Sequence, residues 1–198
     1  MNIHLLHPTR NRKSEMPSFK PELEQFDPER TVILKEYGRV KLRPICPADE
    51  KRMIHFHETL SEETIFLRYF EHISLDTRTL HERLTRVCAN TADSYAIVAE
   101  RHETSHHPAL IMAVGRLTTT EKPTFAAFAL LMSDQAMTTD LPQHLLTRLI
   151  EIARVQGFQF LEGELLVGDH DTLTLCRELG FTSRTIQEDG IIRVSLAI

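Results

Sequence analysis

The chain has 198 residues, of which 41% are hydrophobic and 26% charged, as is typical of a globular protein large enough to bury a core. Its formal net charge of −5 argues against a basic nucleic-acid-binding surface. The longest apolar run, Phe125 to Met132, has the length of a buried strand and is too short to cross a membrane.

The N-terminal part of the chain differs in composition from the rest. Residues 1–30 hold four prolines among charged and polar residues and have no apolar period, which predicts a loosely ordered extension. A partner-binding role for this extension is an alternative to a simple arm. We expect residues 31–198 to form one domain. It begins with a predicted hairpin, because residues 31–45 alternate β-branched and polar residues around Tyr37 and Gly38.

The elements after this hairpin follow from helical start signals and from the period of the apolar residues. Residues 47–56, 61–70 and 75–88 predict three helices, the second of which has an acidic first turn. Strands are predicted over 94–100, 109–120, 124–132, 158–167 and near 191–198, and helices over 141–153 and 172–179. This order predicts an α/β (α+β) fold, with a mixed central sheet and helices on both faces.

Two stretches of the sequence resemble a known family. Residues 43–70 resemble the opening of bacterial GNAT domains of the protein-acetyltransferase type, and residues 126–181 resemble the strand, helix, strand and helix at their centre. The resemblance covers nearly the whole domain and implies the GNAT fold. It also implies an N-acyltransferase that carries an acyl group from acetyl-CoA or another acyl-CoA to an amine, either a protein lysine or a small molecule. Homodimers are common among such proteins, and no nucleic-acid or membrane partner is implied.

The loop that should hold the cofactor pyrophosphate departs from the family pattern. The family has Gln/Arg-x-x-Gly-x-Gly/Ala at the start of the long helix, and the matching residues here are Met137 to Pro142. Side chains at Thr139 and Asp140 replace glycine-type positions, and Pro142 has no N–H donor. Asp140 followed by Gln143 predicts a capping box, in which the carboxylate would occupy the donors that a phosphate needs.

Other positions are assigned to the cofactor only by the resemblance. It implies that the acyl-CoA lies along one strand, the loop and the start of the last helix. The residues at these positions are Leu130, Leu131, Met132, Met137, Thr138, Thr139, Asp140, Leu141 and Asp169. A V-shaped opening between the strands near Leu130 and Leu166 would support a retained cleft.

The general base and general acid of the resembling enzymes are also replaced. A Glu is common at the position of Ala127, and a Tyr acid is common at the position of Cys176. Glu164 matches a glutamate of many relatives and is a candidate base or amine-binding residue, or else a strand glutamate paired with an arginine. Cys176 is a candidate proton donor, or else a core residue. Arg68 lies in a family-like segment that is expected to pack near the acceptor groove.

The cysteines and histidines show no metal-binding pattern. The three cysteines are widely spaced without a CxxC motif, and no signal peptide is evident, which predicts a cytoplasmic protein with free thiols. His55 and His57 point apart on a helix, and His102, His106 and His107 lack regular ligand spacing, so we predict no metal site.

Three hypotheses about function follow from the sequence. The chain is a working N-acyltransferase with a divergent cofactor loop, in which Glu164 or water acts as the base. Alternatively, it is a catalytically inactive binding or regulatory module that has lost acyl-CoA. In the third hypothesis the same cleft holds a different small molecule.

Overall fold

The computed structural model describes residues 19, 26–101, 109–186 and 190–198. These residues form one eight-stranded sheet in the order β1-β2-β3-β4-β5-β6-β8-β7. Neighbouring strands are antiparallel except β5 and β6, which are parallel. The strands are β1 Arg30–Leu34, β2 Gly38–Pro44, β3 Ser94–Arg101, β4 Leu110–Thr119, β5 Phe125–Met132, β6 Phe160–Leu166, β7 Thr182–Ile186 and β8 Ile191–Ala197.

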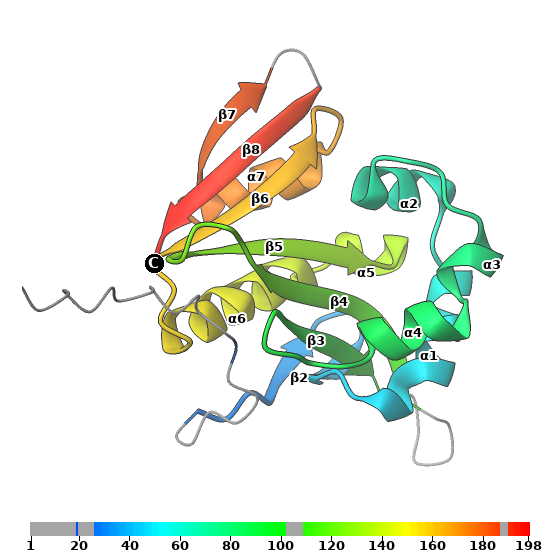
Figure 1. Ribbon diagram of the computed structural model, residues 1–198. Coiled ribbons are helices and arrows are strands. Elements are labelled where there is room, and N and C mark those ends of the chain that lie inside the picture. The colour runs from blue at the N-terminus through cyan, green and yellow to red at the C-terminus, as the bar shows by residue number, and fades with distance from the viewer. Residues whose placement is uncertain (1–18, 20–25, 102–108, 187–189) are drawn as a thin grey trace, which may run out of the picture.

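Helices cover both faces of this sheet, so the predicted mixed α/β architecture is confirmed (Figure 1). A short 3₁₀ turn at Pro47–Asp49 leads into the first helix. The longest helix, α6, and the last helix, α7, each end at a glycine with positive φ, Gly157 at 88° and Gly180 at 87°. The helices are α1 Glu50–Glu58, α2 Glu62–Tyr69, α3 Leu75–Arg78, α4 His81–Val87, α5 Asp134–Met137, α6 Leu141–Val155 and α7 His170–Glu178.

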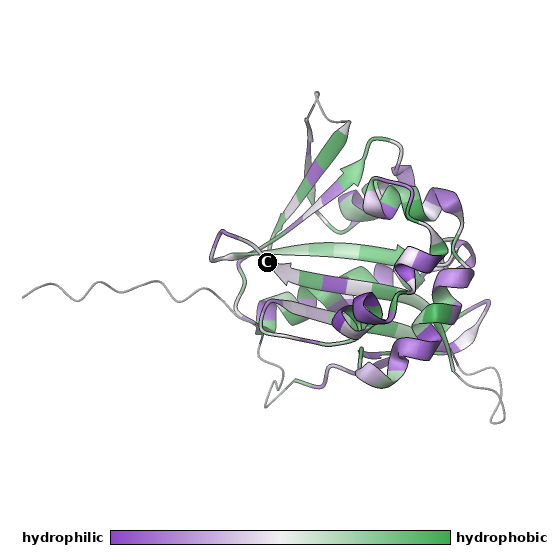
Figure 2. Ribbon diagram, turned by 45° about the vertical axis from the view of Figure 1, so that its right-hand side comes forward, coloured by the Kyte–Doolittle hydropathy of each residue, from purple (hydrophilic) through white to green (hydrophobic). Residues whose placement is uncertain are grey.

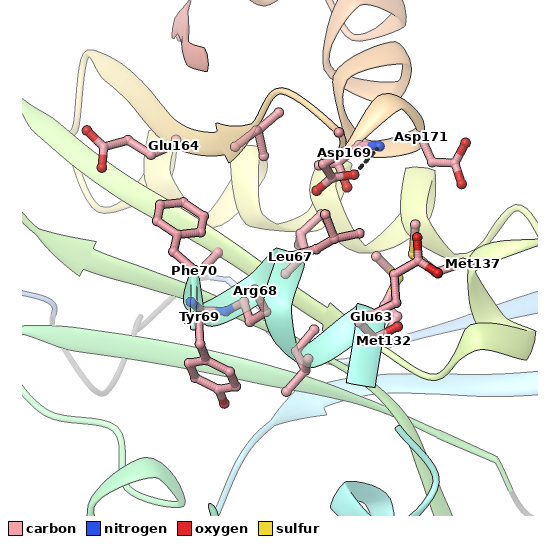
Figure 3. Close-up of a pocket in the computed structure, with 18 of the residues that line it drawn as sticks. Glu63, Leu67, Arg68, Tyr69, Phe70, Met132, Met137, Glu164, Asp169 and Asp171 are labelled. Carbon is pink, nitrogen blue, oxygen red and sulfur yellow. Dashed lines mark hydrogen bonds between the residues drawn. The ribbon is translucent and has the colours of Figure 1, made fainter. Parts of the chain in front are cut away.

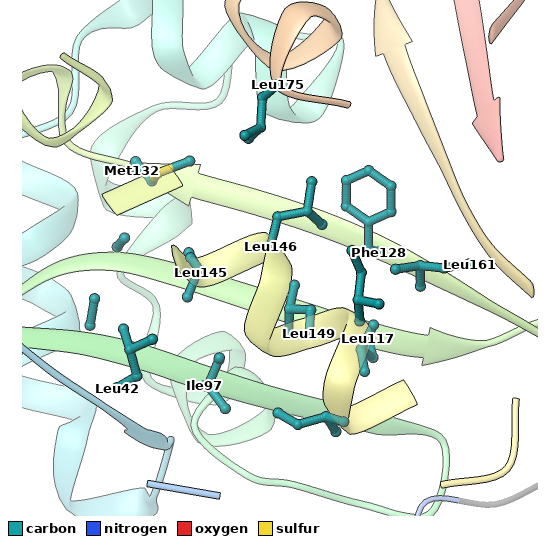
Figure 4. Close-up of a cluster of buried hydrophobic side chains, with 14 of the residues drawn as sticks. Leu42, Ile97, Leu117, Phe128, Met132, Leu145, Leu146, Leu149, Leu161 and Leu175 are labelled. Atoms are coloured by element: carbon teal, nitrogen blue, oxygen red, sulfur yellow. The ribbon is translucent and has the colours of Figure 1, made fainter. Parts of the chain in front are cut away.

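Two hydrophobic cores lie on opposite faces of the sheet because successive strand side chains point to opposite sides. In β3, Ile97 packs in the larger core, which is covered by α6, and Val98 packs in the smaller core beneath α1, α2 and α4. Figure 2 shows that hydrophobic residues are concentrated along the central strands. The larger core includes Leu42, Ile97, Leu117, Phe128, Met132, Leu145, Leu146, Leu149, Leu161 and Leu175 (Figure 4).

Several elements differ from the sequence-based prediction. The helix expected over residues 75–88 is two helices, because the chain turns at Thr79 and Leu80, with Leu80 in an extended conformation. Neither α5 nor β7 was predicted. Within the predicted N-terminal extension, Phe19 is buried against Phe158 and its N–H donates to the carbonyl of Ala92. Residues 1–18 and 20–25 of that extension lie outside the described residues.

His57, at the end of α1, is a buried histidine whose Nδ1 has no hydrogen-bond partner among the described residues. Burial, followed by the positive charges of Arg78 and Arg83, lowers the pKa of this imidazole from 6.5 to about 4. The folded protein therefore holds His57 neutral, whereas the unfolded chain binds a proton below pH 6.5.

Stability should accordingly fall as the pH drops from 7 towards the pKa of the buried His57. The linkage relation gives a loss of about 2 kcal/mol in the free energy of unfolding between pH 7 and pH 5. Urea unfolding at the two pH values measures it. His57→Leu should lose less stability over this range than the wild type, while His144→Leu, at an exposed site on α6, should keep the wild-type loss. An unchanged pH dependence in His57→Leu would show that His57 is not its source.

Candidate functional site

A cleft opens where β5 and β6 stop pairing. The two strands pair at only three positions, from Phe125 with Phe160 to Ala127 with Glu162. Beyond these positions β5 continues to Met132 and β6 to Leu166, and the strands separate (Figure 1). One backbone edge of β5 is therefore left without a strand partner, as the expected V-shaped opening requires.

The ring of Phe128, on β5, lies where β5 and β6 separate. A Cβ added at Gly163 of β6 would lie 2.5 Å from Cε1 of Phe128, so the ring rests against the glycine backbone. The same ring meets Phe181 edge-on, with a centroid distance of 5.4 Å. Because a larger residue at position 163 would displace the ring, glycine and Phe128 together shape the narrow end of the cleft.

The space between the strands is a cavity of about 960 Å³, which we call the main cavity. It lies between α2 on one side and β5, β6 and the start of α7 on the other (Figure 3). This volume is at the upper end of the range for small-molecule and cofactor sites, so the cleft can hold a substantial ligand.

Helix α2 is fixed across the cleft by its N-terminal residues. The Ser61 hydroxyl oxygen accepts a hydrogen bond from the Thr64 N–H and caps the helix. Asp134, at the start of α5, accepts from the Ser61 hydroxyl at 3.0 Å and from the Thr64 hydroxyl at 2.6 Å. These contacts hold the first turn of α2 beside the end of β5 and carry its last turn over the middle of the cleft.

The predicted capping box at Asp140 is wrong. The backbone of Asp140 already has helical angles, φ −77° and ψ −1°, and its side chain makes no capping hydrogen bond. Instead, Oγ1 of Thr139 accepts from the Leu141 N–H at 3.1 Å and donates to the carbonyl of Ala136 at 2.8 Å. Asp140 is exposed, so its carboxylate contributes negative charge to the loop without satisfying the helix donors.

A second depression of about 440 Å³, which we call the loop hollow, lies beside this loop. It contains three carboxylates, from Asp140 of the loop and from Asp171 and Glu178 of α7. Among the described residues that line it, none is a lysine or an arginine. The lining residues are Met137, Thr138, Thr139, Asp140, Pro142, Gln143, Asp171, Thr174, Leu175 and Glu178.

The resemblance implies a set of cofactor positions, and in the structure these lie partly in the main cavity and partly in the loop hollow. Asp169 lines the main cavity and caps α7, because its Oδ1 accepts from the Thr172 N–H at 3.1 Å. Leu141 lines neither hollow, since its side chain is fully buried in the core. Leu130, Leu131, Met132, Met137, Thr138 and Asp169 line the main cavity, whereas Met137, Thr138, Thr139 and Asp140 line the loop hollow.

The candidate catalytic residues are placed less favourably for proton transfer. Ala127 lines the main cavity and brings only a methyl group. Glu164 also lines it, but its carboxylate accepts from the guanidinium of Arg193 at 2.5 Å, and both side chains are about half exposed. This is the arginine-paired arrangement named above as the alternative for Glu164.

Cys176 lies in the core and does not line the main cavity. Burial, and next the charge of Asp169, raise the pKa of its thiol to about 12. A thiol so placed is a poor proton donor and cannot touch a ligand in the cleft. The structure therefore favours the core interpretation of this residue.

Sequence reasoning missed two charged residues of the site, Asp171 and Glu178, and gave a third, Arg68, only a packing role. Asp171 and Glu178 are seven residues apart and so lie on one face of α7, a spacing that could have identified an acidic face. Arg68 was assigned to packing, yet it lines the main cavity. The sequence did offer a signal for a functional role of Arg68, since it is an arginine within a largely apolar helix face.

The described residues contain neither a metal-binding cluster nor a helix that could span a membrane. Over the described ranges, no group of three or more His, Cys, Asp or Glu side chains is arranged to hold a metal ion. His102, His106 and His107 lie outside the described residues. None of the helices in the described part of the chain is long and apolar enough to cross a membrane.

Comparisons with known proteins identify the fold. No protein-family model matches the sequence. The GNAT domain of PAT from S. lividans matches with a TM-score of 0.74 and 22% identity, over 86% of this chain and 97% of that one. RimJ of Mycobacterium smegmatis, solved in complex with CoA-disulfide, matches with a TM-score of 0.66 and 9% identity, over 85% and 86% of the two chains.

A third solved structure is also similar to this chain. The putative acetyltransferase yncA from Salmonella typhimurium, solved with its cofactor acetyl-CoA, matches with a TM-score of 0.55 and 15% identity, over 80% of this chain and 93% of that one. The fold predicted from the resemblance is thus confirmed.

Proposed function

Because the chain has the GNAT fold, we propose that it is a ligand-binding protein derived from that fold, whose main cavity holds a small molecule other than acyl-CoA. In this proposal it does not catalyse acyl transfer from CoA. The observation that carries the proposal is the loop hollow, where three carboxylates and no cation stand at the position implied for the cofactor pyrophosphate.

The charges around the loop hollow support the absence of a pyrophosphate site in this proposal. A diphosphate is favoured by backbone N–H donors at a helix N-terminus and by nearby cations. Here Pro142 has no backbone N–H to donate. The carboxylates of Asp140, Asp171 and Glu178 would repel the negative charges of a diphosphate. At an intermediate dielectric and a few ångströms, such repulsion costs on the order of a few kcal/mol, or roughly a hundredfold in affinity.

The residues at the positions implied for catalysis also disfavour amine acylation. An ammonium must lose a proton before it attacks a thioester, which requires a base near the reacting atoms. The methyl side chain of Ala127 cannot act as a base, and the carboxylate of Glu164 is paired with Arg193. The thiol of Cys176 is buried outside the cavity.

One observation favours a second candidate, an N-acyltransferase with weakened cofactor binding. The unpaired edge of β5 beyond Ala127 can hydrogen-bond an extended chain that carries amides, as the pantetheine arm of CoA does. In this alternative, acetyl-CoA or another acyl-CoA is the cofactor, Glu164 or water is the base, and a protein lysine or small amine is the acceptor.

Isothermal titration with acetyl-CoA and CoA at low salt distinguishes the two candidates. We expect no binding tighter than about 1 mM for either compound, because the loop hollow repels the phosphates. A circular dichroism spectrum of the same sample controls for folding. Binding in the micromolar range would overturn the proposal and favour the acyltransferase.

A further inference from the structure

Arg68 lines the main cavity and has no counterion among the residues that the structure describes. It lies on the last turn of α2 and lines the main cavity, where Figure 3 shows it beside Tyr69 and Phe70. Among the described residues no carboxylate pairs with it, and its guanidinium carbon lies 5.0 Å from the centroid of the Tyr69 ring. Burial lowers the pKa of this guanidinium below its usual value.

Two further arginines reinforce the positive charge behind Arg68. The guanidinium of Arg83, on α4, lies 5.2 Å from the centroid of the same Tyr69 ring. Arg116, on β4, donates to the Ser94 hydroxyl at 2.6 Å and to the carbonyl of Val87, both of which are neutral acceptors. In the part of the chain that the structure describes, neither arginine forms an ion pair with Asp or Glu.

Such a cluster is costly unless something compensates its charge. Removing a guanidinium from water without a counterion costs several kcal/mol. Arg43, on the neighbouring strand β2, shows such compensation, because it pairs with Asp49 and Glu100. Of the three arginines in the cluster behind α2, only Arg68 lines the main cavity.

We propose that Arg68 binds the carboxylate of a small zwitterionic ligand in the main cavity. The other charged groups of the cavity support this ligand class. Asp169 and Asp171 come from α7, on the far side of the cavity from α2, and no cation pairs with either among the described residues (Figure 3). A ligand that carries an ammonium at that end and a carboxylate at the Arg68 end would match both walls.

A carboxylate fits this corner better than a phosphate. Among the described residues two arginines line the main cavity, and one of them, Arg193, is paired with Glu164, which leaves Arg68 for the ligand. A guanidinium matches a carboxylate with two parallel hydrogen bonds. The acidic lining of the rest of the cavity would oppose the additional charge of a phosphate dianion. The side chains of Leu67, Phe70 and Leu130 line the cavity and form an apolar surface against which the ligand can pack. The inference builds on the proposed function, because it names the class of molecule that the cavity holds.

The test uses four probes and two variants of the full chain. Aminocaproate carries both charges, caproate only the carboxylate, hexylamine only the ammonium, and inorganic phosphate is the competing anion. Each is titrated into the wild type, into Arg68→Met, and into Arg86→Met, a matched change at an exposed arginine of α4. Thermal unfolding of the three proteins without probe is measured in parallel.

We expect aminocaproate to bind the wild type more tightly than caproate or hexylamine. Arg68→Met should weaken aminocaproate and caproate by about ten- to a hundredfold, as expected for a charge-assisted hydrogen-bonded pair, and leave hexylamine unchanged. Arg86→Met should bind all four probes as the wild type does. Without probe, Arg68→Met should melt at the wild-type temperature or above it, because it removes an uncompensated buried charge.

Other results would overturn the inference. These are equal affinity of Arg68→Met and wild type for aminocaproate, no wild-type binding of either carboxylate at about 10 mM, or tighter binding of phosphate than of caproate. A marked fall in melting temperature in Arg68→Met would instead indicate a structural arginine. The acetyl-CoA titration does not involve Arg68, so failure of the proposed function would be seen separately.

Discussion

Asp49→Ala is expected to lower the free energy of unfolding by about 3–5 kcal/mol, because it removes a fully buried carboxylate that pairs with two arginines, Arg43 and Arg52. The Asp49 side chain is fully buried. Its two oxygens accept from Nη1 and Nη2 of Arg43, each at 2.8 Å, and Oδ2 also accepts from the Cys46 N–H at 2.9 Å. Arg52, one turn along α1, forms a further ion pair with the same carboxylate.

The network ties three parts of the fold together. Arg43 lies on β2, Glu100 on β3 and Arg52 on α1, and Glu100 accepts from both arginines, at 2.6 and 3.0 Å. Burial works to raise the pKa of Asp49, but the hydrogen bonds from Arg43 and Cys46 outweigh it, so the pKa is lowered overall. The stabilisation is therefore complete at neutral pH and is lost as the pH falls through that lowered value.

Urea unfolding at neutral pH measures this prediction. The matched control is Glu29→Ala, which removes an exposed carboxylate paired with Lys41 and should cost less than about 1 kcal/mol. Asp49→Asn keeps the shape of the side chain but not its charge, and it should fall between the control and Asp49→Ala. A loss below 1 kcal/mol in Asp49→Ala would mean that Glu100 alone compensates the arginines.

The sequence predicted the fold where periodicity is strong and missed elements where it is weak. The alternating pattern of the first hairpin and the apolar stripe of α6 correspond to β1, β2 and α6. Strand β7 escaped prediction because residues 182–185 are exposed at the sheet edge and show no apolar alternation. The break between α3 and α4 escaped because the turn at Thr79 and Leu80 contains neither Gly nor Pro.

The site was harder to predict because its charges come from distant segments. The cap at Asp140 failed because capping depends on backbone angles: Asp140 is already helical, and the preceding Thr139 supplies the side-chain oxygen instead. The loop hollow takes its other two carboxylates from α7, more than thirty residues along the chain. Local patterns carry no information about such a juxtaposition.

Replacing the loop residues should restore cofactor binding if the loop hollow is what excludes CoA. Asp140→Gly with Pro142→Gly removes one carboxylate and restores one backbone donor, and we expect it to raise CoA affinity about tenfold. Adding Asp171→Asn and Glu178→Gln removes the remaining negative charge and should bring the total gain to about a hundredfold. Isothermal titration with CoA at low salt measures both steps, and the gain should shrink at high salt.

The control is matched to Asp171→Asn with Glu178→Gln, the α7 double variant: it also removes two negative charges, but away from the hollow. Asp76→Asn with Glu82→Gln, on α3 and α4, should leave CoA affinity nearly unchanged, because neither residue lines the loop hollow. Equal gains in the control and in the α7 double variant would make net charge the cause. If the variant with all four substitutions binds CoA no more tightly than the wild type, the loop hollow is not what excludes CoA. A poor fit of the main cavity to the rest of CoA then becomes the explanation. A gain that also produced acetyl transfer to an amine would show that Ala127 does not preclude catalysis and that losing the phosphate site was the decisive change.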